Sequence, residues 1–147
     1  MRLAAGPCRH RAGLCRAEGS DGSVHPHHWL VRARTKIGLA NLIATIPGAS
    51  RDRIILGGHY DTKLFRQFRF VGANDGGSSA AFLLEMARVL KARKNPLTME
   101  LLFLDGEEAV REWEGNDHTY GSRHYVDNAR RTGSLASIKA FILVDMI

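Results

Sequence analysis

Four apolar runs set the pattern of hydrophobic and polar positions along this chain. They are rich in Leu, Ile and Val and cover residues 41–46, 53–58, 101–104 and 138–144. Apolar runs of this length that are bounded by turn residues are typical of buried β-strands. The turn pair Pro47-Gly48 follows the first run, so we expect the first two strands to be neighbours in a sheet.

The spacing of apolar residues between these runs predicts helices. Small and apolar side chains recur at i, i+3, i+4 and i+7 over residues 80–90, after Asp75 and before Pro96. This pattern predicts an amphipathic helix that ends before the proline. Residues 117–128 form a weaker helical segment, and residues 62–74 lack a period and indicate a loop. Apolar strands that alternate with amphipathic helices favour an α/β fold, with a parallel or mixed sheet covered on both faces.

The first part of the chain lacks such a pattern. We expect residues 1–35 to be a disordered leader, followed by one folded domain over residues 36–147. The net charge of +6 belongs mostly to the leader, because residues 1–36 hold seven Lys or Arg against two acidic residues, whereas the remainder holds fourteen against thirteen. No basic stripe with interleaved aromatic residues occurs elsewhere, which argues against a nucleic-acid partner.

Both cysteines, Cys8 and Cys15, lie in the leader with four of the seven histidines. Their spacing matches no common zinc pattern, so a small zinc site there is the less favoured interpretation. No apolar stretch approaches the roughly 20 residues that cross a bilayer, and the first residues hold no sustained apolar segment typical of a signal peptide. We therefore expect no membrane partner.

Charged residues and one histidine directly follow three of the apolar runs. These side chains are His59, Asp61, Asp105, Glu107, Glu108 and Asp145. Buried carboxylates are costly unless they are paired or bind a cation. Open α/β sheets bind ligands at the carboxyl ends of their strands, and imidazole and carboxylate are common ligands of divalent cations. The pattern therefore predicts a metal site along one rim of the sheet.

Glu107 and Glu108 are adjacent and cannot face one ligand position equally. One glutamate can bind the ion while the other moves protons beside it; the alternative is a solvated helix start, where acids are favoured. Asp75 is either a ligand or a plain N-cap of the predicted helix. His59 is either a ligand or a structural histidine, and Asp61 is placed to orient its imidazole.

Five short motifs in this order resemble the glutaminyl-peptide cyclotransferases, which belong to the larger zinc aminopeptidase superfamily. The motifs are HYDTK (59–63), GANDGG (72–77), DGEEA (105–109) with Trp113 after it, YGSRH (120–124) and LVDMI (143–147). The resemblance covers roughly residues 36–147. It implies a zinc-exopeptidase-like, three-layer α/β/α fold with a mixed, mostly parallel central sheet.

The resemblance also implies roles for individual residues. By position, Asp75 and Glu108 would bind zinc, and Glu107 would be the general acid/base. Trp113 would line the substrate pocket; the alternative is a tryptophan that packs at a helix edge.

Asp145 would join the catalytic hydrogen-bond network. In a one-zinc cyclotransferase, His59 and Asp61 would support the site. In a two-zinc aminopeptidase, His59 and Asp145 would instead bind the second ion. His118 and His124 are interpreted as surface or packing residues, because neither ends a strand.

The resemblance leads to a hypothesis about the reaction. We expect a zinc-dependent enzyme that converts the N-terminal Gln of peptides to pyroglutamate with release of ammonia. The alternatives are a zinc metallo-aminopeptidase and an inactive binding module. In the family, a third zinc ligand and a further aspartate lie downstream of the last motif. We therefore expect this chain to be the N-terminal part of the enzyme, incomplete at its C-terminus and inactive alone. Family members are commonly exported.

Overall fold

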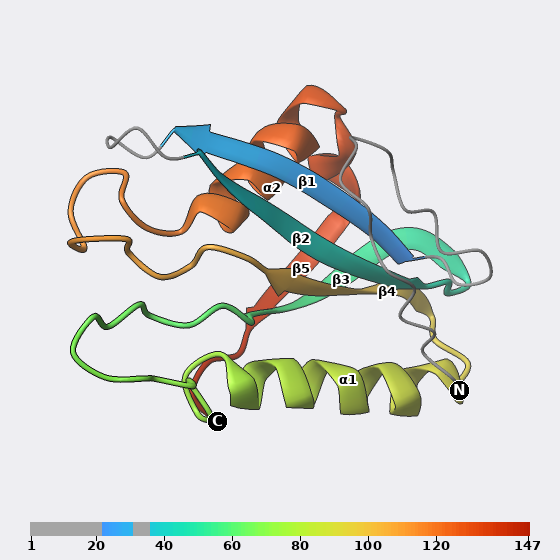
Figure 1. Cartoon of the computed structure of the whole chain (residues 1–147). Helices are drawn as coiled ribbons and strands as arrows, with labels where there is room; N and C mark the ends of the chain where they lie inside the picture. The colour runs from blue at the N-terminus through green and yellow to red at the C-terminus, as the bar shows by residue number, and fades with distance from the viewer. Residues whose placement is uncertain (1–21, 31–35) are drawn as a thin grey trace, which may run out of the picture.

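The computed structural model describes residues 22–30 and 36–147. These residues form one five-stranded sheet in the order β1-β2-β4-β3-β5, together with two α-helices and one 3-10 helix (Figure 1). The strands are β1 (Gly22–Leu30), β2 (Lys36–Ile46), β3 (Ser50–His59), β4 (Leu97–Leu104) and β5 (Ile138–Leu143). The helices are α1 (Gly77–Lys91), α2 (Tyr120–Arg131) and η1 (Ser134–Ser137).

The sheet is mixed. Strand β3 runs parallel to both β4 and β5, whereas β2 runs antiparallel to both β1 and β4. Parallel and antiparallel pairings are therefore equally frequent in the described sheet, and the parallel share is smaller than predicted. The expectation that β2 and β3 are neighbours is wrong, because β4 lies between them. The start of β4 fills the turn between the two strands: a Cβ on Gly48 would lie 2.2 Å from the Leu97 carbonyl carbon.

Strand β1 lies within residues 1–35, where we expected no regular structure. It pairs with β2 along its full length, from Gly22 opposite Ala44 to Leu30 opposite Lys36. This segment forms a strand because its backbone pairs with that of β2. The hydrophobic pattern of the sequence does not signal such pairing. The predictions for Cys8 and Cys15 lie outside the described residues.

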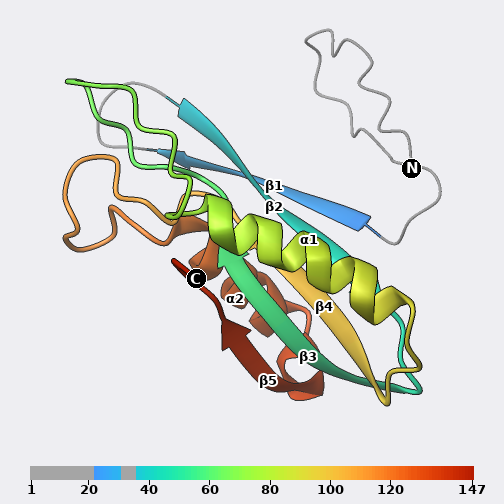
Figure 2. The ribbon, with the colours of Figure 1, turned by 90° about the horizontal axis from the view of Figure 1, so that it is seen from below.

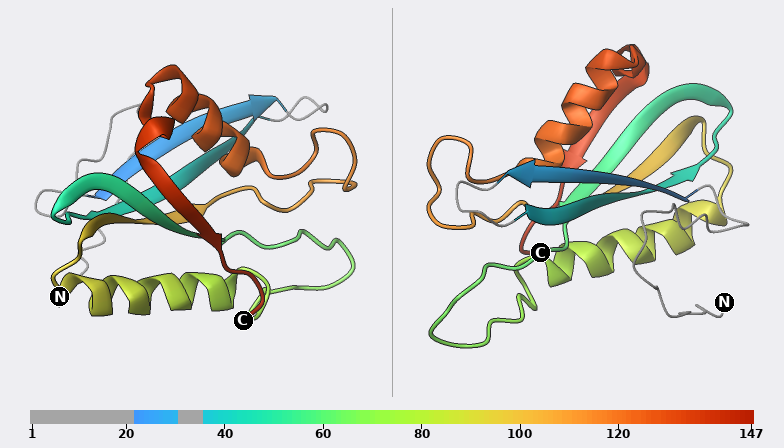
Figure 3. Two further views of the ribbon diagram at one scale, coloured as in Figure 1. Left: turned by 180° about the vertical axis from the view of Figure 1, so that it is seen from behind. Right: turned by 45° about the horizontal axis from the view of Figure 1, so that its top comes forward.

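Helix α1 covers one face of the sheet and α2 covers the other (Figures 1, 2 and 3). Successive strand residues point to opposite faces: Leu101 packs in the cluster under α1, and Leu102 packs in the cluster under α2. The first cluster also contains Leu56, Leu83 and Leu90, and the second contains Ile43, Ile55 and Leu104. This arrangement confirms the predicted three-layer α/β/α architecture.

The parallel strands β3, β4 and β5 bring their carboxyl ends to one edge of the sheet. Two loops, residues 60–76 after β3 and residues 105–119 after β4, project from that edge on the same side (green and orange in Figure 1). Strand β5 is an edge strand, and Phe141, Ile142 and Leu143 are exposed. Neither described α-helix has the length and apolar character that crossing a bilayer requires.

Candidate functional site

The last residue of β3, His59, is the centre of the predicted rim. Its side chain is buried, and its Nε2 lies 3.2 Å from Asp75 Oδ1 and 3.3 Å from Asp145 Oδ1. Its Nδ1 lies 3.5 Å from Asp61 Oδ1. The ligand-type atoms of His59, Asp75 and Asp145 all lie within 4.8 Å of one another. The fold thus brings together three side chains that are far apart in the sequence.

Gly76 allows Asp75 to reach this position. Its φ is 85°, and a Cβ there would lie 2.5 Å from the Asp61 carbonyl oxygen and 3.3 Å from His59 Cε1. Only glycine tolerates both this backbone conformation and this close approach. The N-cap of α1 is Gly76 and no side chain caps the helix, so Asp75 is not the plain N-cap that we considered as an alternative.

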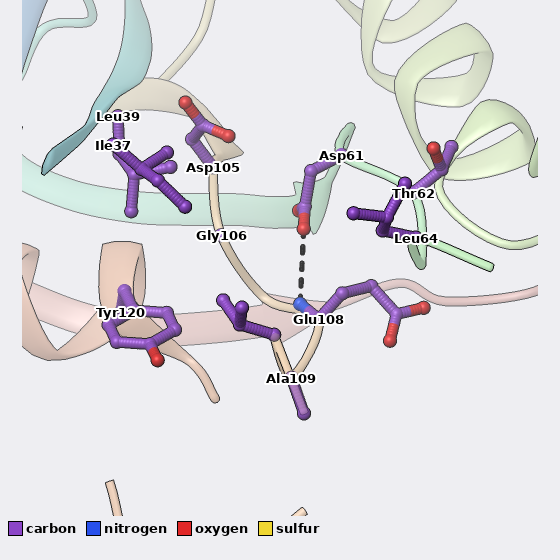
Figure 4. A pocket seen from close by; sticks show the side chains of 11 residues that line it. Ile37, Leu39, Asp61, Thr62, Leu64, Asp105, Gly106, Glu108, Ala109 and Tyr120 are labelled. Atoms are coloured by element: carbon purple, nitrogen blue, oxygen red, sulfur yellow. Dashed lines mark hydrogen bonds between the residues drawn. The ribbon is translucent and has the colours of Figure 1, made fainter. Parts of the chain in front are cut away.

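Asp61 holds the turn that carries the two glutamates. Its Oδ1 accepts a hydrogen bond from the Glu107 N–H at 3.0 Å, and its Oδ2 accepts one from the Glu108 N–H at 3.1 Å (Figure 4). Both glutamates lie in the loop before α2, which begins at Tyr120, so the alternative of a solvated helix start is wrong. Burial alone would raise the pKa of Asp61, but hydrogen bonds from His59 and these two N–H groups lower it.

Negative charge is concentrated at this edge. Burial, followed by repulsion from neighbouring carboxylates, raises the pKa of Glu107 to about 7, although His59 opposes the shift. Burial and then repulsion from Asp75 raise the pKa of Glu108, and Lys63 opposes this. The hydrogen bond with Asp61 raises the pKa of His59 to about 9, because it outweighs the effect of burial. Each group is shifted toward its protonated form.

The residues present fit a divalent cation. An imidazole nitrogen and two carboxylates that face one another form a donor set for such an ion, and the His59 atom that faces both carboxylates is Nε2. The group within 4.8 Å is His59, Asp75 and Asp145. Glu108 lies outside this group but close enough to Asp75 for their charges to interact.

Asp105 also ends β4, but it turns away from the rim. Its Oδ2 accepts a hydrogen bond from the Ala40 N–H at 2.7 Å, and its own N–H donates to Asn41 Oδ1 at 3.1 Å. The buried Asn41 also donates from Nδ2 to the Gly121 carbonyl oxygen at 2.8 Å. Asn41 therefore fastens the glutamate turn to the start of α2. We did not predict this role, although a polar residue at the start of an apolar run was the available signal.

Trp113 lies in the loop before α2 and stacks on His118, with ring centroids 4.6 Å apart. It lines a pocket of about 400 Å³ that also contacts Asp75 and Glu108. Packing at a helix edge therefore does not describe this residue, and His118 has a packing role, as predicted.

A second pocket of about 200 Å³ lies beside the hydrogen bond between Asp61 and Glu108 (Figure 4). Most of its walls are apolar, with Ile37, Leu39, Leu64, Ala109 and Tyr120 among them.

Comparisons with known proteins agree with this geometry. The model of peptidase family M28 matches residues 41–147. A glutaminyl-peptide cyclotransferase of Drosophila melanogaster is 34% identical over 132 residues, which cover 86% of this chain and 37% of that protein. A glutaminyl-peptide cyclotransferase-like protein of Bos taurus is 40% identical over 134 residues, which cover 78% of this chain and 35% of that protein.

A solved structure shows the same likeness in three dimensions. The crystal structure of an Acidobacteriales bacterium glutaminyl cyclase superposes with a TM-score of 0.82 at 38% sequence identity, covering 86% of this chain and 43% of that one. The chain thus spans a little over a third of the length of the two relatives described above. Because the family model matches most of the sequence, this chain belongs to peptidase family M28.

Proposed function

We propose that this chain carries part of the active site of a zinc-dependent glutaminyl-peptide cyclotransferase. The observation that carries the proposal is the position of Glu107: it is half-buried, held by Asp61 through its backbone, and adjacent to a cluster of imidazole and carboxylate ligands. The names of the relatives that match this chain support cyclisation of N-terminal Gln as the reaction.

In this proposal Asp75 and Glu108 hold the zinc ion, and His59 and Asp145 complete or support the site. The bound ion would supply Lewis-acid polarisation of the substrate's amide oxygen. Asp61 keeps the glutamate turn in place and orients the His59 imidazole. Trp113 forms one wall of the pocket beside the ligands.

Glu107 moves the proton. The substrate's α-amine forms a C–N bond to the γ-carboxamide carbon of N-terminal Gln, and the original C–N bond of that amide breaks. Glu107 accepts the proton that the amine loses and donates it to the departing nitrogen, which leaves as ammonia. A pKa near neutrality suits a group that must both accept and donate a proton. Asp145, beside His59, helps to hold the developing charges.

A metallo-aminopeptidase is the second candidate, because the matching family model is that of a peptidase. Glu107 would then deprotonate the water that hydrolyses the first peptide bond. An inactive, truncated binding module is the third candidate, and zinc-dependent turnover by the 147-residue chain itself would exclude it.

One incubation separates the cyclotransferase from the aminopeptidase. The full-length protein is mixed with zinc and a peptide that begins with Gln, and the products are resolved by mass spectrometry. We expect the pyroglutamyl peptide and ammonia. Free glutamine without cyclised peptide would contradict the proposal and favour the aminopeptidase. The same peptide with an acetylated N-terminus is the control, because its blocked amine cannot cyclise.

A further inference from the structure

Two side chains hold the backbone of the glutamate turn, residues 105–108, at its two ends. Asp61 accepts hydrogen bonds from the last two N–H groups of the turn. Asn41 of β2 accepts a hydrogen bond from the first one, the Asp105 N–H, at 3.1 Å. The turn is therefore held from β2 as well as from the loop after β3.

The start of α2 fixes the middle of the turn. The Tyr120 N–H donates to the Gly106 carbonyl oxygen at 2.8 Å, and the Thr119 N–H donates to the Glu107 carbonyl oxygen at 2.8 Å. The Asn41 side chain holds this helix too, because its Nδ2 donates to the carbonyl oxygen of residue 121 at 2.8 Å. One carboxamide thus joins the turn to the helix that bonds to its middle.

The Asn41 carboxamide is placed by both of these partners. They lie 64 and 80 residues further along the chain, and Asn41 is only 1% exposed. Losing the carboxamide would leave a backbone N–H and a backbone carbonyl oxygen without their partners, and a buried unsatisfied polar group is costly. The contact therefore sets the spacing between the turn and α2.

Gly121, the glycine of the YGSRH motif, lies where the turn, α2 and Asn41 meet. A Cβ on Gly121 would lie 2.3 Å from the Asp105 carbonyl oxygen and 2.4 Å from Asn41 Oδ1. Its φ is outside the left-handed region, so the close approach, rather than the backbone conformation, requires glycine. The Asp105 oxygen belongs to the backbone and cannot rotate away. A larger residue at 121 must therefore displace the turn or the helix.

We propose that Asn41 and Gly121 are positioning residues that together set where the glutamate turn presents the Glu107 carboxylate. The inference rests on the proposed function only in taking Glu107 as the proton carrier and Glu108 as a zinc ligand. Neither positioning residue belongs to the candidate metal ligands, so both act through the turn. A general base must lie within hydrogen-bond reach of the proton that it accepts, and a displacement of about 1 Å can lower a rate by about 100-fold.

The test uses Gly121→Ala and Asn41→Ala in the full-length protein, with zinc and a peptide that begins with Gln. Gly121→Ala is the sharper variant, because it removes no hydrogen-bonding side chain and alanine favours a helix more than glycine does. We expect kcat to fall by about 100-fold in both variants. KM should stay within about threefold, because the groups that bind the substrate are unchanged.

Gly133→Ala, just beyond the other end of α2, is the matched control. Its φ is 71°, so alanine is strained there, but a Cβ would meet nothing within 4 Å among the described residues. The control should lower Tm and keep kcat. All rates are measured well below the Tm of each variant. If Gly121→Ala also lowered Tm and kept kcat, its role would be structural and the inference would be overturned. A fall of kcat in all three variants would overturn it too.

The change in kcat can be measured from either product, the cyclised peptide or released glutamine. Failure of the cyclase proposal is therefore distinct from failure of this one. If neither product forms, the Kd of zinc, measured by calorimetry, replaces kcat, because Glu108 lies on the same turn. Weaker zinc binding in Gly121→Ala but not in Gly133→Ala would then support the inference, and an equal Kd in both would overturn it.

Discussion

Two neighbouring glutamates at this site share a backbone anchor but differ in their surroundings. Asp61 accepts hydrogen bonds from the backbone N–H groups of both Glu107 and Glu108, and burial is the largest cause of the raised pKa of each, which for Glu107 is about 7. Glu108 also interacts with the charge of Asp75 and lines both pockets. The two environments support a proton carrier at 107 and a metal ligand at 108.

Glu107→Gln tests this division of roles. The amide keeps the size of the side chain but cannot carry a proton at neutral pH, so we expect kcat of the full-length enzyme to fall by about 100-fold or more. Zinc content, measured by atomic spectroscopy, should stay unchanged. Glu112→Gln, an exposed change on the same loop, is the control. Loss of zinc in Glu107→Gln would show that the two glutamates have exchanged roles.

The sequence predicted which charged residues follow the strands. It did not predict which groups all of these side chains contact. His59, Asp75 and Asp145 converge because the ends of β3 and β5 and the start of α1 meet at the same edge. Asp105 follows the same type of strand but turns toward Ala40 and Asn41 instead. The direction of a side chain after a strand depends on the turn that follows it, and local sequence pattern does not determine that turn.

The elements on the α2 side are joined by a buried ion pair. The Arg53 guanidinium of β3 lies 2.5 Å from Glu100 Oε2 of β4, and Tyr125 of α2 donates to the other oxygen of Glu100. Arg53 also donates to Ser137 Oγ and to the Ser134 carbonyl oxygen of η1. This network anchors α2 and η1 to the sheet.

Removing the positive partner should destabilise the fold strongly. Arg53→Met leaves the buried Glu100 carboxylate without its counter-charge, so we expect the free energy of unfolding to fall by about 3–5 kcal/mol. Lys139→Met is the matched control: it breaks the exposed Lys139–Asp52 pair, and we expect a loss of less than about 1 kcal/mol. Urea unfolding followed by circular dichroism measures both. Equal losses would contradict the stated role of Arg53.

The main elements were predictable because their apolar patterns are local. The α1 pattern and the apolar runs that became β3, β4 and β5 gave the type and approximate position of each element. The position of β4 between β2 and β3 was not predictable, since it depends on backbone pairing between segments that are far apart in the sequence. The same holds for β1, whose pairing with β2 leaves no hydrophobic period in the sequence.

At the scale of the whole molecule, the candidate metal centre links parts of the chain that are far apart in the sequence. His59 ends β3, Asp75 precedes α1, and Asp145 follows β5. A cation that binds these side chains binds only the folded state. Its binding energy therefore adds to the stability of the fold.

Zinc should raise the Tm of protein that has first been treated with a chelator. At a free zinc concentration 100 times Kd, the added stability is about 2.7 kcal/mol. Asp75→Asn should lose most of the zinc-dependent shift while unfolding normally without metal. Asp127→Asn, an exposed change on α2, should keep the full shift. Scanning calorimetry with and without zinc measures all three proteins, and equal shifts in all of them would place the ion elsewhere.

Asp61 holds the glutamate turn through backbone groups alone, so the side chains at positions 107 and 108 are free to change. Its hydrogen bonds go to the peptide N–H groups of residues 107 and 108, which every amino acid except proline possesses. Replacing either glutamate therefore leaves the frame of the turn intact. Single substitutions at these two positions can alter the chemistry of the rim without rebuilding the loop that presents it.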